Sequence, residues 1–430
     1  MSWLRRYRIA IGAVLIVCAG VLVVLLMRNG DTSADMVADD TAKAADKAQL
    51  DPKAIERGRA VAVAADCAAC HTRPGGGRAY AGGYTLQTPF GDILSSNITP
   101  DRATGIGDWT ERDFFRAVRH GRSPRHMLYP AMPYPSYVRI SDADMHDMWS
   151  YFRSLPAASG DTGGTRLGFP FNVRELMLGW NLLFFRNDAP ARAGEVNRGQ
   201  YLVDVLGHCG ACHTAKNALG GDSGYLGGGT LQDWHAPALH NGMQHGLGSW
   251  SDADIVAYLK TGSNAHSIAA GPMAEAVEHS TQYMPDADLR AMAAYLKKLP
   301  GPAETKPQPV AANDPAMVRG ARVYVTACSG CHAPGGTGIA GMATRLADNP
   351  AIRAPDTASL THVLMTGSRA AATDANPTAA GMPGFAWKLS DADAAAVLTY
   401  VRNTWGNAAP AVSAGDVAKA RRALKARKPM

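Results

Sequence analysis

The stretch Cys67-Ala68-Ala69-Cys70-His71 recurs twice along this chain of 430 residues, as Cys209-Gly210-Ala211-Cys212-His213 and as Cys328-Ser329-Gly330-Cys331-His332. Two cysteines separated by two residues and followed at once by a histidine form the attachment signature of c-type haem. Both thiols then form thioether bonds to the porphyrin, and the histidine binds the iron as its proximal ligand. The pattern therefore predicts three covalent haem c groups, each with one ligand from His71, His213 or His332.

Two other uses of paired cysteines compete with haem attachment. A disulfide would join each pair but would leave the following histidine unexplained. A structural zinc ion takes four ligands, and here the first two pairs are 142 residues apart in the chain. The seventh cysteine, Cys18, lies within an apolar run, where we expect a small buried or lipid-facing residue.

A longer repeat surrounds the first two motifs. Trp109, Gly121 and Met132 follow His71, and an equivalent set follows His213, namely Trp250, Gly262 and Met273. In both copies 12 residues separate the Trp from the Gly, and 11 separate the Gly from the Met. The third copy is shorter and lacks the Trp, so that Met382 follows His332 by 50 residues rather than 61 or 60. Such a register indicates diverged copies of one domain.

The methionines of this repeat are candidates for the sixth iron ligand. Each stands beside a proline: Met132-Pro133, Pro272-Met273 and Met382-Pro383. A His/Met pair raises the reduction potential of haem iron, and it fills the last coordination position, which favours electron transfer over catalysis. Methionine is also a common core filler, and the rival methionines are Met127, Met284, Met342 and Met365.

The expected fold class is mainly α, with three tandem cytochrome c domains after an N-terminal transmembrane helix. We expect an anchor (1–30), a linker (31–50), domain 1 (51–157), an apolar inter-domain segment (158–192), domain 2 (193–300), a Pro-rich linker (301–312), domain 3 (313–408) and a basic tail (409–430). The apolar segment is expected to pack between domains, with a partner surface as the alternative. The tail is expected to be a solvated helix, with anionic lipid or an acidic partner as alternatives.

The ends of each domain show helical patterns. Each first helix carries a glycine and each last helix a tyrosine, and we expect close packing of Gly58 on Tyr151, Gly199 on Tyr295, and Gly320 on Tyr400; a loose turn at each glycine is the alternative. Ser or Asp before the last helices (Ser141, Asp286 and Ser390) is an N-cap signature.

The N-terminus predicts a membrane anchor. Arg5, Arg6 and Arg8 precede an uncharged run at 9–27, which as a helix would span roughly 28 Å, close to the hydrocarbon thickness of a bilayer. The basic side stays in the cytoplasm, so the rest of the chain is expected to be exported, either behind a retained anchor, which we favour, or behind a cleaved signal peptide. The net charge of +6 is not the concentrated basic stripe of a nucleic-acid binder.

Beyond the haem motifs, several stretches carry a resemblance to a known family. These are Thr88-Pro89-Phe90-Gly91, Asn97-Ile98-Thr99-Pro100-Asp101, Leu128-Tyr129-Pro130-Ala131-Met132-Pro133-Tyr134, Gly271-Pro272-Met273-Ala274-Glu275 and Thr404-Trp405-Gly406-Asn407. Over residues 51–408 the chain resembles the tri-haem cytochrome c subunits of bacterial membrane-bound dehydrogenases.

The resemblance implies a catalytic partner subunit that oxidises an alcohol, aldehyde or gluconate in the periplasm, and electron transfer through three haems to ubiquinone in the inner membrane. In domain 2, Trp234-His235-Ala236-Pro237-Ala238-Leu239 replaces the Asn-Ile-Thr-Pro stretch. Alcohol and gluconate dehydrogenase cytochromes tend to repeat that stretch in domain 2, so the replacement, together with the N-terminal anchor, is more similar to cytochromes that serve molybdopterin and iron–sulfur aldehyde dehydrogenases. A quinoprotein or flavoprotein partner is the alternative. The chain itself is then no enzyme. A multi-haem peroxidase, which needs an open iron position, and a cytochrome subunit of a respiratory oxidase are the alternatives.

Overall fold

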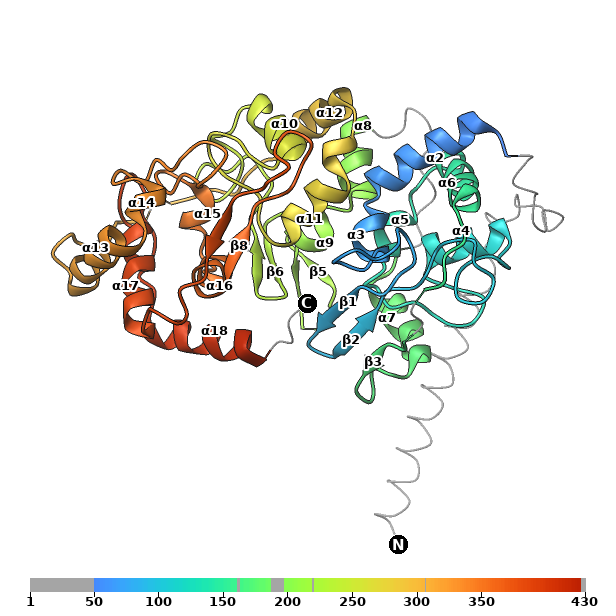
Figure 1. The fold of residues 1–430 in the computed structure, drawn as a ribbon, viewed down its shortest axis with the longest axis horizontal. Coiled ribbons are helices and arrows are strands. Elements are labelled where there is room, and N and C mark those ends of the chain that lie inside the picture. Colours follow the sequence, from blue (N-terminus) through green and yellow to red (C-terminus); the bar gives the residue numbers. More distant parts are fainter. Residues whose placement is uncertain (1–49, 161–162, 187–196, 219, 306, 427–430) are drawn as a thin grey trace, which may run out of the picture.

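The computed structural model describes residues 50–160, 163–186, 197–218, 220–305 and 307–426. This part of the chain is mainly helical, as predicted, and forms three units in a row, with the first at the right of Figure 1, the second in the middle and the third at the left. None of the helices within the described residues is long and apolar enough to span a membrane. The predicted anchor at residues 1–30 lies outside the described residues.

Unit 1 is a bundle of helices with one small hairpin. Its elements are α2 (Pro52–Ala64), α3 (Cys67–His71), β1 (Thr85–Thr88), β2 (Gly91–Leu94), α4 (Glu111–His120), α5 (Tyr134–Tyr137) and α6 (Asp142–Ser154). The antiparallel hairpin of β1 and β2 gains a third strand, β3 (Arg166–Leu167), from the inter-domain segment.

Unit 2 repeats this order with a divided first helix. It contains α8 (Arg198–Gln200), the π-helical turn η4 (Tyr201–Leu206), α9 (Gly210–His213), β4 (Ala215–Lys216), β5 (Asp222–Ser223), β6 (Gly229–Leu231), β7 (Trp234–Ala236), α10 (Asp252–Thr261), α11 (Pro272–His279), η5 (Thr281–Tyr283) and α12 (Asp286–Leu296). Strands β4 and β5 pair with each other, as do β6 and β7.

Unit 3 has its own hydrophobic core. It comprises α13 (Pro315–Ala327), α14 (Ser329–His332), α15 (Pro350–Arg353), α16 (Ala358–Thr366), β8 (Gly367–Arg369), β9 (Gly381–Pro383) and α17 (Asp391–Val401). The predicted solvated tail is instead a docked helix, α18 (Ala414–Ala426), because Val417 is fully buried in this core and the Arg421 guanidinium donates to Asp391 and to two backbone carbonyls.

The first and last helices of each unit cross at a glycine, which confirms the predicted close packing. A Cβ on Gly320 would lie 2.6 Å from the Tyr400 Cβ, and one on Gly199 would lie 3.0 Å from the Tyr295 Cβ. In all three units the atom nearest to such a Cβ is a backbone carbonyl oxygen one turn before the tyrosine, at Asp147, Ala291 and Ala396. At these positions any side chain would push the two helices apart.

An arginine next to each of these glycines ties the same two helices together. Arg198 pairs with Asp288 at 2.7 Å, and Arg319 pairs with Asp393 at 2.8 Å, in the first turn of the last helix. In unit 1, Arg57 pairs instead with Asp147 at 2.6 Å, one turn later. The carboxylate of Asp144, at the position that matches Asp288, accepts the Tyr201 hydroxyl of unit 2 at 2.6 Å.

Two of the three predicted helix caps are present. The Ser141 hydroxyl accepts the backbone N–H of Asp144, and the Ser390 hydroxyl accepts that of Asp393. Helix α12 differs, since its N-cap is Pro285 and Asp286 is already its first helical residue. That helix start therefore has acidic residues in its first turn but no side-chain cap.

Units 1 and 2 share one hydrophobic core, which includes Phe152 and Met145 of unit 1 together with Leu202 and Leu289 of unit 2. Unit 3 joins unit 2 through a small apolar cluster and several polar contacts. There the Trp234 and His362 rings stack with centroids 4.3 Å apart, and the backbone N–H of His235 donates to the Ser359 hydroxyl at 2.7 Å. Unit 2 is therefore in contact with both of its neighbours.

The apolar inter-domain segment packs partly between units, as expected. It contains η3 (Arg174–Leu176) and α7 (Met177–Phe184). The Tyr134 hydroxyl of unit 1 donates to the buried Asn181 side chain at 2.6 Å, and the Phe184 ring lies over Gly221 of unit 2. The opposite side of this segment is exposed, with Leu176 and Leu183 among the exposed large apolar residues.

Candidate functional site

The three CxxCH motifs fold in the same way. Each forms a short helix that ends at its histidine: α3, α9 and α14. In each, the imidazole Nδ1 lies within hydrogen-bond distance of a backbone carbonyl: Ser96 at 2.7 Å, Pro237 at 2.6 Å and Thr344 at 3.0 Å. A carbonyl can only accept, so Nδ1 carries the proton, and Nε2 is left with its lone pair free for a metal.

A second contact repeats at the backbone of each histidine. The carbonyls of His71, His213 and His332 accept N–H groups from Gly82, Gly228 and Gly338 at 2.7, 2.9 and 3.0 Å. All three glycines have φ between 67° and 94°, the left-handed region that glycine adopts without steric cost. The loop after each motif therefore folds back and fixes the histidine at its backbone as well as at its ring.

The charge state of the imidazoles suits iron binding. Burial lowers the pKa of His71, His213 and His332, and the hydrogen bond to the backbone carbonyl opposes this only in part. All three residues nevertheless keep part of their surface accessible. A neutral imidazole in dense surroundings with one accessible face is what an axial haem ligand requires.

The six motif cysteines are all unpaired, so the structure contains no disulfide at any of the three motifs. Burial raises the pKa of Cys67, Cys70 and Cys209 to about 12 and that of Cys328 to about 11. Thiols that hold their protons so firmly are poor thiolate ligands and poor enzymatic nucleophiles. Across the described residues no group of three or more His, Cys, Asp or Glu side chains is placed to hold a metal ion.

The candidate methionines pack against the same cores as the motif cysteines. Met132 and Met273 join Cys67 and Cys209 at the surface of the core shared by units 1 and 2, and Met382 joins Cys328 at the core of unit 3. Each of the three is partly buried rather than enclosed. The helix that carries Met273, α11, also packs against α3, the motif helix of unit 1.

The rival methionines differ in their surroundings. Met284 and Met365 are buried within the hydrophobic cores at 4% and 3% exposure, whereas Met342 is 55% exposed in a loop of unit 3. Met127 is partly buried and forms an isolated antiparallel β-bridge with Arg122, just after the end of α4. Full enclosure in aliphatic packing is typical of a core filler, so Met284 and Met365 fit that role.

Trp250 supports the presence of a bound group in unit 2. Its indole stacks on His266 with centroids 5.4 Å apart, and its Nε1–H is buried without any acceptor. Buried polar groups are rarely left without partners, and a cofactor with acceptor oxygens would satisfy this one. Trp109 packs at the edge of the shared core. The motif cysteines, the oriented imidazoles and this orphan donor together fit haem c.

Several functional contacts could not be found from the sequence. The acceptors at Ser96, Pro237 and Thr344 are backbone carbonyls, which leave no residue-type signal. Tyr137 is a further example, since its hydroxyl donates to the Ala65 carbonyl at 2.6 Å and lies 3.3 Å from Nδ1 of His208, the residue before the second motif.

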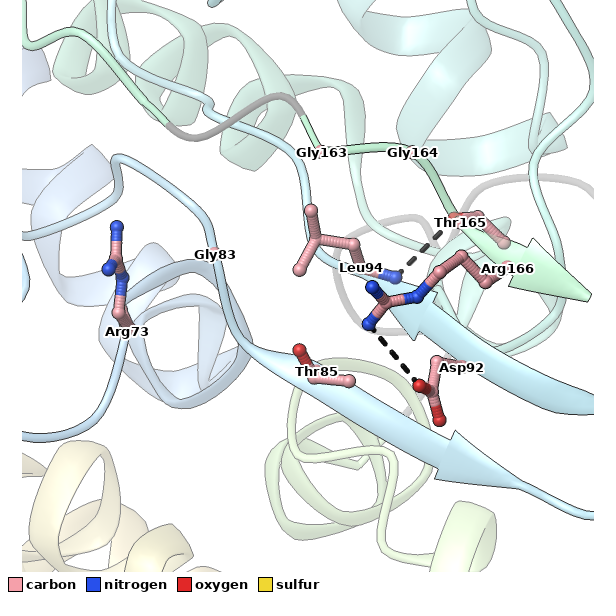
Figure 2. Close-up of a pocket in the computed structure, with 9 residues that line it drawn as sticks. All are labelled: Arg73, Gly83, Thr85, Asp92, Leu94, Gly163, Gly164, Thr165 and Arg166. Carbon is pink, nitrogen blue, oxygen red and sulfur yellow. Dashed lines mark hydrogen bonds and ion pairs between the residues drawn. The ribbon is translucent and has the colours of Figure 1, made fainter. Parts of the chain in front are cut away.

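A separate cavity of about 450 Å³ lies at the sheet of unit 1 (Figure 2). Arg73 stands on one side, and the Arg166–Asp92 ion pair lies on the other at 3.4 Å. None of the motif cysteines, histidines or candidate methionines lines this cavity. It is therefore distinct from the predicted haem sites.

Comparison with known proteins gives the family. The cytochrome c family matches three times, at residues 55–156, 196–300 and 317–405. The chain is 38% identical over 429 residues to the gluconate 2-dehydrogenase cytochrome c subunit of Pantoea cypripedii, covering 93% of this chain and 95% of that protein. It is 39% identical over 405 residues to the cytochrome c subunit of the quinone alcohol dehydrogenase of Gluconobacter oxydans, covering 88% and 84%.

A third relative is larger. It is a subunit of the nicotinate dehydrogenase of Pseudomonas putida, 42% identical over 375 residues, which are 83% of this chain but only 31% of that protein. The first two of these relatives are named as cytochrome c subunits of dehydrogenases, in agreement with the predicted role as an electron-carrying subunit. With three matched segments and mainly helical units, the chain belongs to the cytochrome c family.

Proposed function

We propose that the chain carries three covalent haem c groups and relays electrons from a periplasmic dehydrogenase subunit to ubiquinone in the bacterial inner membrane. The haems are bound at Cys67 and Cys70, at Cys209 and Cys212, and at Cys328 and Cys331. His71 and Met132, His213 and Met273, and His332 and Met382 are their iron ligands. Bound haem c supplies reversible one-electron chemistry at its iron.

The observation that carries this proposal is the threefold repetition of one histidine geometry. A carbonyl hydrogen bond holds the proton of each imidazole on Nδ1 and leaves Nε2 without one. Such an outer contact fixes the tautomer and raises the basicity of the ligand. Met132, Met273 and Met382 would each supply the second protein ligand and leave no coordination position for a substrate, so the protein would carry electrons without binding one.

The arrangement of the units supports a linear relay through unit 2. The Cys70 thiol of unit 1 lies close enough to Cys212 and Glu275 of unit 2 that both contribute to its raised pKa, after burial and Asp66. Unit 3 meets unit 2 through the Trp234–His362 stack. Units 1 and 3 stand at opposite ends of the row in Figure 1, so one end receives electrons and the other delivers them.

Haem counting and ligand replacement test the proposal. Pyridine haemochrome analysis of the purified full chain should give three haem c per polypeptide, and replacing one cysteine pair by alanine should leave two. Replacing Met132, Met273 or Met382 one at a time should each remove part of the sulfur-to-iron charge-transfer absorbance and lower one of three midpoint potentials. A count of two or fewer, or three variants with unchanged spectra, contradicts the proposal.

The partner proposed is a catalytic dehydrogenase subunit of the molybdopterin and iron–sulfur type, with quinoprotein and flavoprotein subunits as the alternatives. The replacement of the Asn-Ile-Thr-Pro stretch in unit 2 favours it. Purification of the tagged full chain from its own cells, followed by metal and cofactor analysis of the co-purified subunit, decides between the three. A proposed N-terminal anchor at 1–30 holds the relay beside the quinone pool.

The relatives do not favour the two alternatives, a multi-haem peroxidase or an oxidase subunit, because they are named as dehydrogenase subunits. A peroxidase would show a high-spin haem that reacts with peroxide. The absorbance spectra recorded for the methionine variants would reveal such a high-spin haem.

A further inference from the structure

A hairpin of unit 3 extends to unit 2. It consists of residues 367–383, with β8 at its start and β9 at its end, and we call it the arm. The candidate iron ligand Met382 lies on β9, opposite Ser368 of β8. Between the two strands the chain runs toward unit 2 (Figure 1), where the Thr373 hydroxyl donates to the carbonyl of Thr261, the last residue of α10, at 3.4 Å. The arm therefore carries the candidate ligand of its own unit and contacts the neighbouring unit.

The arm packs against the segment that carries Met273, the candidate ligand of unit 2. Ala370 forms an antiparallel β-bridge with Ala270, three residues before Met273. Ala371 is 2% exposed and joins a small apolar cluster of unit 2, against which the Met273 side chain also packs. The other buried members of this cluster are Ala269, Ala274 and Val277. The contacts with the arm thus involve residues on both sides of Met273 in the sequence.

Polar bonds fix the arm to the end of helix α11. The Glu278 side chain is only 15% exposed, and its Oε1 accepts the Ala372 backbone N–H at 2.6 Å and the Arg369 guanidinium at 2.7 Å. Just after the helix, the Gln282 side-chain oxygen accepts the backbone N–H of Asp374 at 3.1 Å. All three donors belong to the arm. Hydrogen bonds to an ionised acceptor are the stronger kind, so Glu278 is the main polar contact between the arm and this helix.

Unit 1 provides a parallel with a different partner. Tyr134 follows Met132 by two residues, and its hydroxyl donates to the Asn181 side chain at 2.6 Å. The Tyr129 hydroxyl, on the other side of Met132, donates to the Phe171 carbonyl at 2.8 Å. Both acceptors belong to the inter-domain segment rather than to unit 1 itself. In units 1 and 2 alike, the segment that carries the candidate methionine is held from outside its own unit.

We propose that the arm is a positioning element for the haem site of unit 2, which keeps Met273 on the iron. A thioether sulfur is a weak donor, so the position of its segment decides how often a competing ligand can take its place. The bonds from the arm stabilise the arrangement in which this segment is closed, and they shift the population toward it. The sixth ligand of unit 2 therefore depends on residues of unit 3. This inference rests on the proposed function, because it requires Met273 to bind iron.

Imidazole binding to the full haem-loaded chain tests this proposal, because imidazole takes the sixth position of an iron only when the methionine leaves it. Titration of the oxidised chain, followed by absorbance, gives an affinity for each haem. Met273→Ala identifies the haem of unit 2, which then binds imidazole without competition. Glu278→Ala removes two hydrogen bonds to the arm and should raise the imidazole affinity of this haem about tenfold. The affinities of the other two haems should not change.

Matched variants separate positioning from a general loss of stability. Glu56→Ala is the control, because it removes a carboxylate that also pairs with an arginine at 2.7 Å but only within helix α2. It should leave all three imidazole affinities unchanged. Glu278→Gln keeps an acceptor for the Ala372 N–H and should give an affinity between those of the wild type and Glu278→Ala. The double variant Met273→Ala, Glu278→Ala should match Met273→Ala, since no methionine is left to position.

A substitution on the side of unit 3 gives an independent test. Arg369→Ala removes only the ion pair and leaves the backbone donor in place, so it should raise the imidazole affinity of the same haem by less than Glu278→Ala does. The proposal is overturned if both variants leave the haem of unit 2 as closed as in the wild type, or if they open all three haems equally. If Met273→Ala itself opens no haem, the ligand assignment in the proposed function is wrong, which is a different result.

Discussion

Gly320→Ala in unit 3 is the sharpest test of how the units are built. Gly320 lies where α13 crosses α17, and a Cβ there would lie 2.6 Å from the Tyr400 Cβ and closer still to the Ala396 carbonyl oxygen. The oxygen belongs to a helix backbone, so it cannot rotate away as a side chain would. The two helices must separate, and the Arg319–Asp393 ion pair at 2.8 Å spans the same crossing.

Two opposing effects set the size of the change. Alanine in place of glycine within a helix gains about 1 kcal/mol, whereas overpacking a tight contact costs about 1–3 kcal/mol and occasionally more. Because the obstacle is backbone, we place the cost at or above the upper end. The expected net loss is then about 2 kcal/mol, which lowers the unfolding midpoint of a domain of this size by roughly 10 °C.

The assay must isolate unit 3, which has a core of its own. Hydrogen exchange of the full chain in increasing urea, read by mass spectrometry, follows peptides of α13 and α17 separately from those of units 1 and 2. Gly330→Ala is the control, since a Cβ there meets no atom within 4 Å and unit 1 has Ala69 at the matching motif position. If α13 opens at the same urea concentration in Gly320→Ala as in the wild type and the control, tight helix crossing does not stabilise the unit.

Three further predictions concern ligands, charge and the junction of units 1 and 2. Met382→Ala should remove the sulfur ligand in unit 3 and lower one of the three haem midpoint potentials. The control Met365→Leu, a substitution in the hydrophobic core, should leave all three midpoint potentials at their wild-type values. A redox titration of both variants measures the difference. The hydrogen bond from Arg319 is the main reason why the pKa of Asp393 lies below its ordinary value. The ionised Asp393 therefore stabilises the folded protein above about pH 4, and this contribution is lost as the pH falls through the lowered pKa of the folded state. Acid unfolding of Asp393→Asn should accordingly start from a lower stability at neutral pH and show a weaker pH dependence below about pH 4, and an unchanged acid transition in unit 3 would rule this out. Tyr201→Phe removes two hydrogen bonds to unit 1 and should destabilise the shared core by about 1–3 kcal/mol. Amide exchange in α6 and in η4 should then rise together. If exchange rises in η4 alone, the Tyr201 hydroxyl stabilises only unit 2.

The sequence predicted those features that depend on residue type at fixed spacing. The motif helices, the mainly helical units and the tight crossings at Gly58, Gly199 and Gly320 all follow from such patterns. A cysteine pair, an imidazole or a missing side chain acts through its own chemistry. The crossing at Gly58 has the same register as the other two, because the nearest atom in each case is the carbonyl oxygen four residues before the tyrosine, at Asp147, Ala291 and Ala396. In unit 1 the last helix has shifted its ionic partner, since Asp144 is used by Tyr201 of the next unit.

The features that sequence could not give depend on backbone atoms or on contacts between units. Ser96, Pro237 and Thr344 have no common residue type, yet each supplies the same carbonyl to a histidine. The tail at 409–430 looked like a solvated basic helix because its lysines and arginines dominate its composition. Its docking depends on the buried Val417 and on the Arg421 hydrogen bonds, and one buried valine in a helix that is mostly charged gives too weak a periodic signal to find.

The unequal junctions have a consequence for a relay. Units 1 and 2 share a single core, so any movement that separates their motifs must open apolar packing and is energetically costly. Unit 3 meets unit 2 through a small alanine and valine cluster, one ring stack and polar contacts. This junction therefore contains fewer buried apolar side chains than the core shared by units 1 and 2. Electron transfer depends steeply on the separation of the redox groups, so a fixed separation is best assured between units 1 and 2.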